Sequence, residues 1–293
     1  MVTVGIATSG RPEILGLLLK RLEEQTCKAD EVIIVASKLS DIPTAASQYQ
    51  NITALIDEGG LTAKRNRILD RAQNSDYIFF FDDDFVPDNA FIESMAKEFD
   101  QDLTIVAQTG LVVRDGITTE GIDFFEAIKA LESHAETINN ELKQTSCSVY
   151  NAYGCNMAFR GIVIKSNGIT FDENLPLYGW LEDVDFSRSI AKYGKIQYNP
   201  YAKGVHLGTK LSRQSGVRFG FSQIVNPIYL SMKGTMSWRR ALAQISRNLA
   251  MNVFKSVSPE PYVDRKGRLI GNFKGVLSVL KGDINPRNIL VLD

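Results

Sequence analysis

Three consecutive carboxylates, Asp82, Asp83 and Asp84, follow the apolar run of residues 77–81. Adjacent carboxylates repel one another, and a folded chain tolerates them when a divalent cation or hydrogen bonds offset the repulsion. Oxygen ligands of this kind suit Mg²⁺ or Mn²⁺, which commonly take further ligands from the phosphates of a substrate. The stretch therefore predicts a metal–diphosphate site. The alternative is a solvated turn between a strand and the next helix.

A second acidic pair, Glu182 and Asp183, begins a predicted helix over residues 181–193. The helix macrodipole favours an ionised carboxylate in the first turn, and an ionised carboxylate can act as a general base. Tyr178 and Trp180 come just before and could form an apolar floor for a sugar ring. The alternative is that the two acids only cap the helix.

Cations and hydroxyl groups gather in two further segments. TSGRP (residues 8–12) follows the first predicted strand, and Lys64 and Arg65 lie in the first turns of a predicted helix. Helix N-termini and fixed cations both suit phosphate groups. The alternative for Arg65 is a surface charge on the helix.

The two histidines receive different interpretations. His134 lies in a polar helical stretch and is expected on the surface. His206 lies between Gly204 and Gly208, just after a short predicted strand. For His206 two interpretations stay open, a metal ligand or diphosphate contact on one side and a residue packed in a loop on the other.

The elements that must position these groups alternate in type along the first half of the chain. The pattern predicts strands over 2–8, 31–36 and 77–81, and helices over 12–24 and 62–72. This alternation predicts a parallel sheet flanked by helices. Ligands of such sheets bind outside the carboxyl ends of the strands, where Thr8, Ser37 and the three aspartates fall.

The second half is expected to add fewer strands. The pattern predicts helices over 89–100, 121–144 and 181–193, the last ended by Gly194, and strands over 103–109, 150–159 and 196–198, the last before Pro200. Residues 238–255 form a predicted basic amphipathic helix with Trp238, Leu242, Ile245 and Leu249 at helical spacing.

Composition limits the class of protein. A chain of 293 residues, 44% hydrophobic and 23% charged, suits one large globular unit or two closely abutting ones. It has no uninterrupted apolar stretch of about 18 residues, and its start lacks the pattern of a signal peptide, so we expect a cytoplasmic protein. Cys27, Cys147 and Cys155 form no CxxC pair and are expected to be reduced thiols.

Charge is distributed unevenly along the chain. Residues 201–293 hold 15 Lys and Arg against 4 Asp and Glu, a local balance of +11, which leaves −12 for residues 1–200. Such a region suits an anionic partner, namely a membrane surface, a phosphate-bearing substrate or nucleic acid, unless it is only a solvated face. Its amphipathic helix could rest on an anionic membrane, pack on the body of the protein or form a homodimer contact.

Taken in order, ATSGRP, GLTAKRN, FFFDDDFVPD, GCNMAFR and WLEDVDFSRSIAKYG resemble the family 2 glycosyltransferases, inverting enzymes of the GT-A fold. The resemblance implies an α/β fold with a Rossmann-like, mixed but mostly parallel sheet flanked by helices. It covers a glycosyltransferase domain over residues 1–215, with a nucleotide-binding part (1–110) and an acceptor-binding part (111–215). Residues 216–293 form a basic helical C-terminal extension similar to that of some bacterial polysaccharide-assembly members.

The resemblance also implies residue roles. Asp183 matches the catalytic base, and Glu182 beside it positions the acceptor. Asp82 and Asp84 match the DXD pair, whose members hold Mn²⁺ or Mg²⁺ and the ribose or diphosphate of the nucleotide, and His206 is a candidate third ligand. Nucleotide-sugar contacts are assigned to Thr8, Arg11, Lys64, Arg65, Asp83, Asn156 and Trp180, with Arg213 as a cation for the leaving diphosphate.

One departure affects the donor. The family often carries an aspartate at the end of the second strand to grip the base, whereas this chain offers Ser37 there. Ser37 is therefore taken as a donor contact, and the nucleobase stays open, with a UDP-sugar as the first expectation. The expected acceptor is a glycan or lipid-linked glycan, with no nucleic acid partner, at the inner face of the cell membrane if the protein is peripheral.

Two other functions remain as alternatives. A sugar-phosphate nucleotidyltransferase also uses an α/β sheet and acidic metal ligands, but it usually has a glycine-rich basic loop, of which TSGRP is a poor version. A noncatalytic module could hold Ca²⁺ with its carboxylates and a glycan with its aromatic residues. That reading leaves TSGRP and KRN unexplained.

Overall fold

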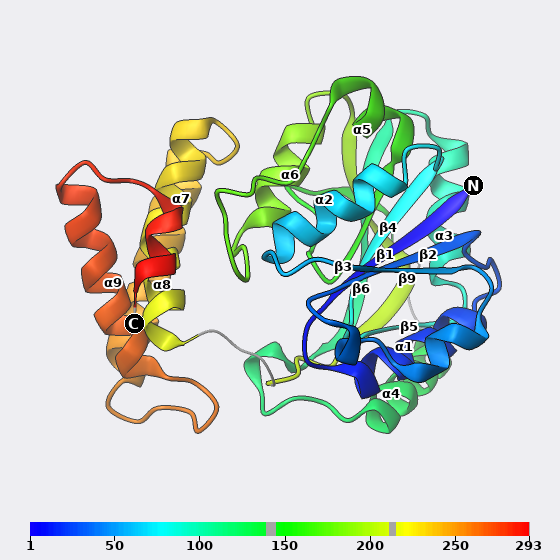
Figure 1. Cartoon of the computed structure of the whole chain (residues 1–293), viewed down its shortest axis with the longest axis horizontal. Coiled ribbons are helices and arrows are strands. Elements are labelled where there is room, and N and C mark those ends of the chain that lie inside the picture. Colours follow the sequence, from blue (N-terminus) through cyan, green and yellow to red (C-terminus); the bar gives the residue numbers. More distant parts are fainter. Residues whose placement is uncertain (139–144, 211–214, 293) are drawn as a thin grey trace.

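A sheet covered by helices on both faces lies beside a group of three C-terminal helices (Figure 1). This computed structural model describes residues 1–138, 145–210 and 215–292. The strands are β1 (Val2–Thr8), β2 (Glu31–Ala36), β3 (Ile52–Ile56), β4 (Tyr77–Asp82), β5 (Phe85–Pro87), β6 (Ile105–Asp115), β7 (Cys147–Ser148), β8 (Asn156–Arg160) and β9 (Lys195–His206). The helices are α1 (Pro12–Glu23), α2 (Leu61–Arg71), α3 (Phe91–Gln101), α4 (Phe124–Ile138), α5 (Gly161–Asn167), α6 (Glu182–Ile190), α7 (Gly216–Lys233), α8 (Trp238–Lys255) and α9 (Arg265–Leu280).

The strands form one mixed, mostly parallel sheet in the order β3-β2-β1-β4-β8-β6-β9-β5, with β7 paired to β9. The first four strands of this order are parallel, whereas β8 runs antiparallel to both β4 and β6. The α/β class and the flanking helices expected from the sequence are confirmed. Among the described residues, no helix is both long enough and apolar enough to span a membrane.

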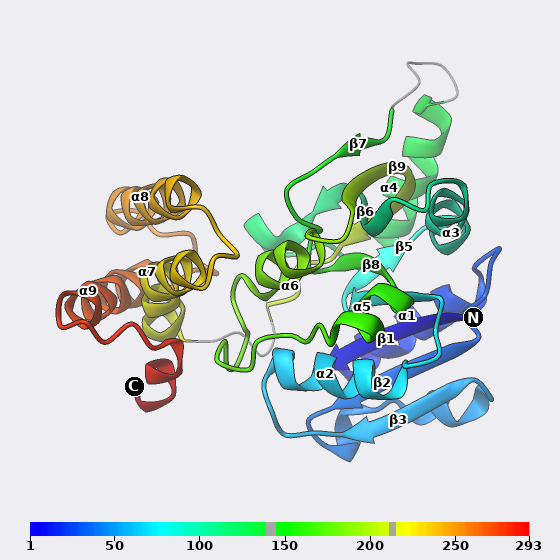
Figure 2. The same cartoon turned by 90° about the horizontal axis from the view of Figure 1, so that it is seen from above.

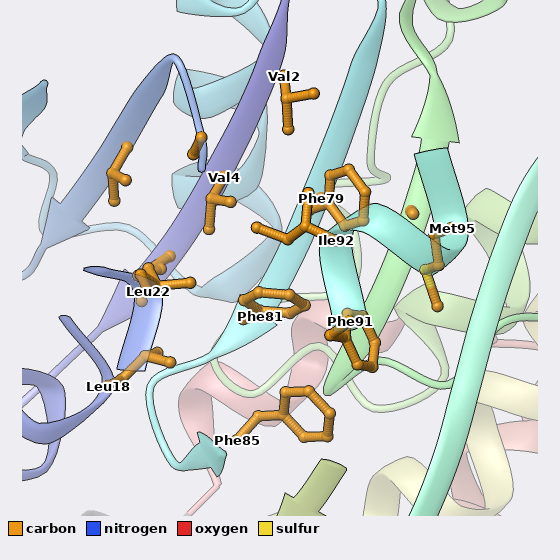
Figure 3. Packing of buried hydrophobic residues seen from close by; sticks show 14 of the residues in the cluster. Val2, Val4, Leu18, Leu22, Phe79, Phe81, Phe85, Phe91, Ile92 and Met95 are labelled. Carbon is orange, nitrogen blue, oxygen red and sulfur yellow. The ribbon is translucent and has the colours of Figure 1, made fainter. Parts of the chain in front are cut away.

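The apolar run of β4 has the pattern of a strand buried on both faces. Successive side chains of a strand point to opposite faces. Phe79 and Phe81 accordingly join the core beneath α1 and α3, and Phe80 joins the core on the other face. Phe81, Phe85 and Phe91 pack ring against ring, with centroids 5.3 to 5.4 Å apart (Figure 3). This packing holds the three aspartates on a rigid support between two strands.

Several expected boundaries were wrong in the second half. The strand placed at 150–159 begins only at Asn156, and the one placed at 196–198 runs on to His206 as part of β9. Pro200 does not end it, because the pairing with β6 jumps from Gly110↔Asn199 to Leu111↔Lys203 and leaves Pro200 in a bulge.

Other elements were missed or misplaced. The short elements β3, β5 and α5 were not expected at all. Gly194 was expected to end α6, but the helix ends at Ile190 with Ala191 at its C-cap, and Gly194 is not in the left-handed conformation of a capping glycine. A Cβ at Gly194 would lie 2.4 Å from the carbonyl oxygen of Thr104, so this glycine permits a close approach of two chain segments. The expected helix over 121–144 is α4, and residues 139–144 lie outside the described part.

The C-terminal helices attach to the body through α7 and the start of α8, and α9 lies farthest from the sheet (Figure 2). Leu230 of α7 packs in one cluster with Leu175, Leu181 and Val184 of the body. Helix α9 crosses α7 closely, since a Cβ at Gly271 would lie 2.0 Å from the carbonyl oxygen of Val217. Such close crossings need small residues at the contact.

Candidate active site

Asp82 is the last residue of β4 and pairs with Ala7 of β1, and Asp83 and Asp84 follow it directly. Asp83 points toward the protein interior, where its Oδ2 accepts a hydrogen bond from the Thr8 hydroxyl at 2.7 Å and its Oδ1 lies 2.9 Å from Arg11 Nη2. Burial raises the pKa of Asp83 to about 7, although Arg11 opposes that shift. Arg11 also reaches Asp84, at 3.3 Å. Thr8 therefore contacts Asp83, and Arg11 contacts both Asp83 and Asp84, while their role as nucleotide contacts stays a prediction.

His206 of β9 lies beside the aspartates, and we call the place where Asp82, Asp84 and His206 meet the corner. Its Nε2 lies 3.4 Å from Asp84 Oδ1, and its Nδ1 lies 2.9 Å from Asp115 Oδ1. Burial lowers the pKa of His206, but the hydrogen bonds and charges of Asp115 and Asp84 outweigh it and raise this pKa to about 10. Tyr153 in turn donates a hydrogen bond to Asp115 Oδ2 at 2.8 Å.

Asp115 and Tyr153 were missed from the sequence. Asp115 ends β6 at the same edge of the sheet, and a carboxylate at a strand end is the signal that identified Asp82. The signal was overlooked because that strand was expected to stop at Thr109.

The residues at this corner fit a divalent cation. Asp82, Asp84 and His206 each offer one ligand atom, and these atoms all lie within 4.8 Å of one another. Two carboxylates and an imidazole suit Mn²⁺ or Mg²⁺ when a substrate completes the coordination. Asp115 would orient the His206 ring through Nδ1, the usual arrangement behind a metal-bound imidazole.

Arg65 joins this corner to the second acidic pair. Its Nη1 donates to Glu182 Oε1 at 2.5 Å, and its Nη2 donates to Asp82 Oδ1 at 3.0 Å and to the carbonyl oxygen of Gly154 at 2.9 Å. Only 2% of the Arg65 side chain is exposed, so it is not the surface charge considered as an alternative. Phe80 and Phe171 lie against its guanidinium.

Glu182 and Asp183 open α6 and differ in exposure. Glu182 is buried and Asp183 is partly exposed. Asp183 Oδ2 accepts from the backbone N–H of Gly154 at 3.2 Å, and Oδ1 accepts from that of Val184 at 2.8 Å. Burial raises the pKa of Asp183 above its ordinary value, and these two amides oppose the shift.

Glu182 keeps one oxygen available. Burial raises its pKa to about 8, and Arg65 pulls the pKa in the opposite direction. Within the part of the chain that the structure describes, Glu182 Oε2 has no hydrogen-bond partner. A buried polar atom without a partner is costly, so it marks a place where a ligand group can bind.

Lys64 and Ser37 meet at the carboxyl ends of the neighbouring strands. Lys64 Nζ donates to Ser37 Oγ at 2.6 Å, and Ser37 donates to Ser9 Oγ at 3.0 Å. Burial lowers the pKa of Lys64. This polar group extends the site from the aspartates toward β2.

Two of the expected contacts lie elsewhere or outside the described residues. Asn156 is fully buried, and its Oδ1 accepts from Thr109 Oγ1 at 2.6 Å and from Gly110 N at 3.2 Å, so it joins β8 to β6 instead of facing the crevice. Arg213 lies outside the described residues.

Trp180 belongs to an aromatic group that includes a residue missed from the sequence, Phe219 of α7. The ring centroid of Phe219 lies 5.7 Å from that of Trp180 and 6.3 Å from that of Tyr178. Leu177 and Leu181 both have positive φ, 60° and 75°. Non-glycine residues in this region are strained, and strain of this kind gathers at functional sites.

Comparisons with known proteins identify the family and the fold. A family model described as glycosyl transferase family 2 matches residues 3–164. No curated protein matches the chain. The fold is similar to that of S. aureus TarS 1-349, with a TM-score of 0.58, 14% identity, and 97% of this chain and 82% of that chain covered. The TarS fragment in complex with UDP-GlcNAc aligns with a TM-score of 0.59 and 15% identity over the same shares.

GalNAc-T7 with UDP, GalNAc and Mn²⁺ is also similar, with a TM-score of 0.60 and 16% identity. The alignment covers 97% of this chain and 57% of that one. At such identities the likeness concerns the fold.

Proposed function

The chain belongs to glycosyl transferase family 2, and from this membership we propose an inverting, metal-dependent transfer of a sugar from a nucleoside diphosphate sugar to a hydroxyl group. The acceptor in this proposal is a glycan or a lipid-linked glycan. The chain is thus a glycosyltransferase, which sets aside the nucleotidyltransferase and the noncatalytic module.

One observation carries the proposal, the bridge that Arg65 makes between Asp82 and Glu182. The bridge supports the proposal because Asp82 of the candidate metal site and Glu182, the neighbour of the candidate base Asp183, contact the same guanidinium. A donor diphosphate at the corner would therefore present its sugar near Asp183, and proximity of this kind supplies a large part of enzymatic rate enhancement.

Asp183 is proposed as the general base. It would accept the proton from the acceptor hydroxyl while that oxygen bonds to the anomeric carbon and the bond from that carbon to the diphosphate oxygen breaks. The raised pKa of Asp183 strengthens it as a base, while its hydrogen bonds from Gly154 and Val184 fix its orientation. Glu182 Oε2 is proposed to hold a second acceptor hydroxyl.

Asp82, Asp84 and His206 are proposed to hold the divalent cation. When bound, such a cation supplies positive charge to the diphosphate that leaves. Arg11 lies beside Asp83 and Asp84 and is proposed to bind the same group electrostatically.

Thr8, Ser37 and Lys64 are proposed to face the nucleoside end of the donor. Ser37 provides a hydroxyl in place of a carboxylate, and Lys64 donates a hydrogen bond to that hydroxyl. UDP-sugars are the first donors to test, because UDP or UDP-GlcNAc occupies two structures that share this fold. Tyr178, Trp180 and Phe219 are proposed as the apolar floor beneath the acceptor.

The test is the change Asp183→Asn, which keeps the size of the side chain and removes its basicity. We expect transfer to fall by about 10²–10⁴-fold, the usual contribution of a general base. Turnover is measured by release of the nucleoside diphosphate, after a thermal-shift screen of sugar nucleotides with Mn²⁺ has identified the donor.

The donor should still raise the melting temperature of the Asp183→Asn variant as it does for the unchanged protein. Glu132→Gln, which removes an exposed carboxylate on α4, should leave transfer unchanged. Full transfer by Asp183→Asn would rule out Asp183 as the base.

A further inference from the structure

Helix α9 has one face packed on α7 and an opposite face that is apolar and exposed. Gly271 and Gly275 form the packed face, since added Cβ atoms would lie 2.0 Å from Val217 O and 2.9 Å from Ile224 Cβ. The exposed residues of the other face are Ile270 (53% exposed), Phe273 (63%), Leu277 (39%) and Leu280 (77%). The solvent-exposed face of a surface helix normally carries charged or polar residues at these outward positions.

Helix α8 carries a similar row. Its buried residues are Ala241 and Asn252, and Asn252 donates to Asn272 of α9 at 2.9 Å and to Gln223 of α7 at 2.8 Å. One side of α8 is lined by Trp238 (51% exposed), Leu242 (57%), Leu249 (38%) and Val253 (50%). Their spacing places them within about a sixth of a turn of one another.

The two rows lie on the same side of the pair. Asn252 and Asn272 mark the seam between α8 and α9. Consecutive residues of a helix are about 100° apart around its axis. On each of the two helices, this spacing puts the seam residue between the residues that pack toward α7 and the exposed apolar row. Both exposed rows therefore lie on the side of the seam that faces away from α7, and Figures 1 and 2 show α9 as the outermost helix. We call these exposed rows the outer apolar face.

Positive charge surrounds this face. Residues 238–281 contain nine Lys and Arg but only two acidic residues, Glu260 and Asp264. Arg239, Lys266 and Lys281 are exposed, and none of the three forms an ion pair with any carboxylate that the structure describes. The charge is therefore available to a partner.

We propose that the outer apolar face rests on the surface of an anionic lipid bilayer. Apolar side chains of such a helix pair enter the boundary between headgroups and acyl chains, while lysine and arginine reach the lipid phosphates. Trp238 suits the same boundary. A second copy of the chain fits less well, because two faces with this excess of positive charge repel when they meet. The proposal does not depend on the identity of the sugar donor or of the base.

Flotation of the full chain with vesicles tests the proposal. We expect binding to phosphatidylcholine vesicles that contain phosphatidylglycerol, weaker binding as salt is raised, and little binding to phosphatidylcholine alone. Phe273→Ser combined with Leu280→Ser should weaken binding by about tenfold or more, because two exposed apolar side chains that would enter the bilayer are lost. Lys266→Glu combined with Lys281→Glu should weaken it to a similar degree.

Matched controls change residues outside the C-terminal helices. Phe125→Ser with Leu103→Ser changes two side chains of similar exposure, 70% and 77%, outside the C-terminal helices. Lys20→Glu with Lys192→Glu reverses two exposed charges of the body. Both controls should bind vesicles as the unchanged chain does, at an unchanged melting temperature.

Three outcomes would overturn the proposal. The first is failure of the unchanged chain to bind anionic vesicles. The second is equal binding by the outer-face variants and their controls. The third is a dimer in solution that Phe273→Ser with Leu280→Ser converts to a monomer, which would assign the face to a second copy.

Discussion

The buried guanidinium of Arg65 forms ion pairs with two carboxylates, those of Asp82 and Glu182. Arg65→Met would leave Glu182 and Asp82 facing each other across an apolar side chain. Removing one partner of a buried ion pair costs about 3–5 kcal/mol, because the other charge stays buried and unpaired. We expect a loss of this order in the free energy of unfolding, measured with urea, and loss of transfer.

Arg65→Lys separates charge from geometry. One ammonium cannot reproduce the planar fork that reaches Asp82, Glu182 and the Gly154 carbonyl together. This variant should therefore also lose transfer while it keeps more stability than Arg65→Met. Arg67→Met is the control, since Arg67 is 53% exposed and lies 3.8 Å from Asp57, and it should change stability by less than about 0.5 kcal/mol. Normal transfer by Arg65→Lys would contradict the bridging role.

Residue types predicted much of the site, but partners were not visible in the sequence. An acidic triplet at the end of a strand and cations at a helix start have chemical preferences that do not depend on the rest of the fold. Arg65 and Glu182, however, are 117 positions apart, and only the packing of α6 against the sheet brings them together. Asn156 is the opposite case, because the sequence predicted a ligand contact, whereas its side chain makes hydrogen bonds that join two strands.

At the scale of elements, local patterns predicted β1 and β2 with their observed bounds, since buried parallel strands give continuous apolar runs between turn residues. The strands β6 and β9 were predicted too short, because their pairing contains register shifts that no local pattern reveals. Phe219 was missed for a related reason. Its role depends on the docking of α7, which a helical pattern cannot show.

Lys233 at the end of α7 fastens that helix to the body. Its Nζ lies 2.6 Å from Asp172 Oδ2 and 2.7 Å from Asp185 Oδ2. Burial disfavours the ionised form of Asp172, but hydrogen bonds from Lys233, from the Asn174 amide and from Tyr229 outweigh burial and lower its pKa. A lowered pKa contributes stability above the unfolded value of about 4, and that contribution is lost as the pH falls through the folded pKa.

The change Lys233→Met should therefore destabilise the protein at neutral pH by about 1–2 kcal/mol, discounted because a third of the Lys233 side chain is exposed. The difference between the variant and the unchanged chain should shrink as the pH falls below about 4. Urea unfolding across this pH range measures it. Lys192→Met, at an exposed lysine, should show no such difference at any pH, and a Lys233→Met effect that persisted in acid would contradict the ion-pair explanation.

At the scale of the whole molecule, the division into a domain over 1–215 and an extension over 216–293 remains a proposal, and the two parts share structure at the site. Leu230 of α7 packs with Leu175 and Leu181, and Asn226 donates to the carbonyl oxygen of Trp180 at 2.8 Å. The segment that leads into the acidic pair of α6 is thus supported by the extension. The extension would thus have two roles: it would support the apolar floor beneath the acceptor, and it would bind a lipid surface.

Truncation after residue 215 separates these roles. It would expose Leu175, Leu181 and Val184, which are now 0%, 8% and 7% exposed, and would leave the strained segment without its support. We expect the fragment to lose about 3 kcal/mol or more of stability and most of its transfer to a water-soluble acceptor. Phe273→Ser with Leu280→Ser, which leaves α7 in place, should keep that transfer. If the fragment melted and turned over like the full chain, α7 would have no part in the active site, because support for the acidic pair would then come from the body alone.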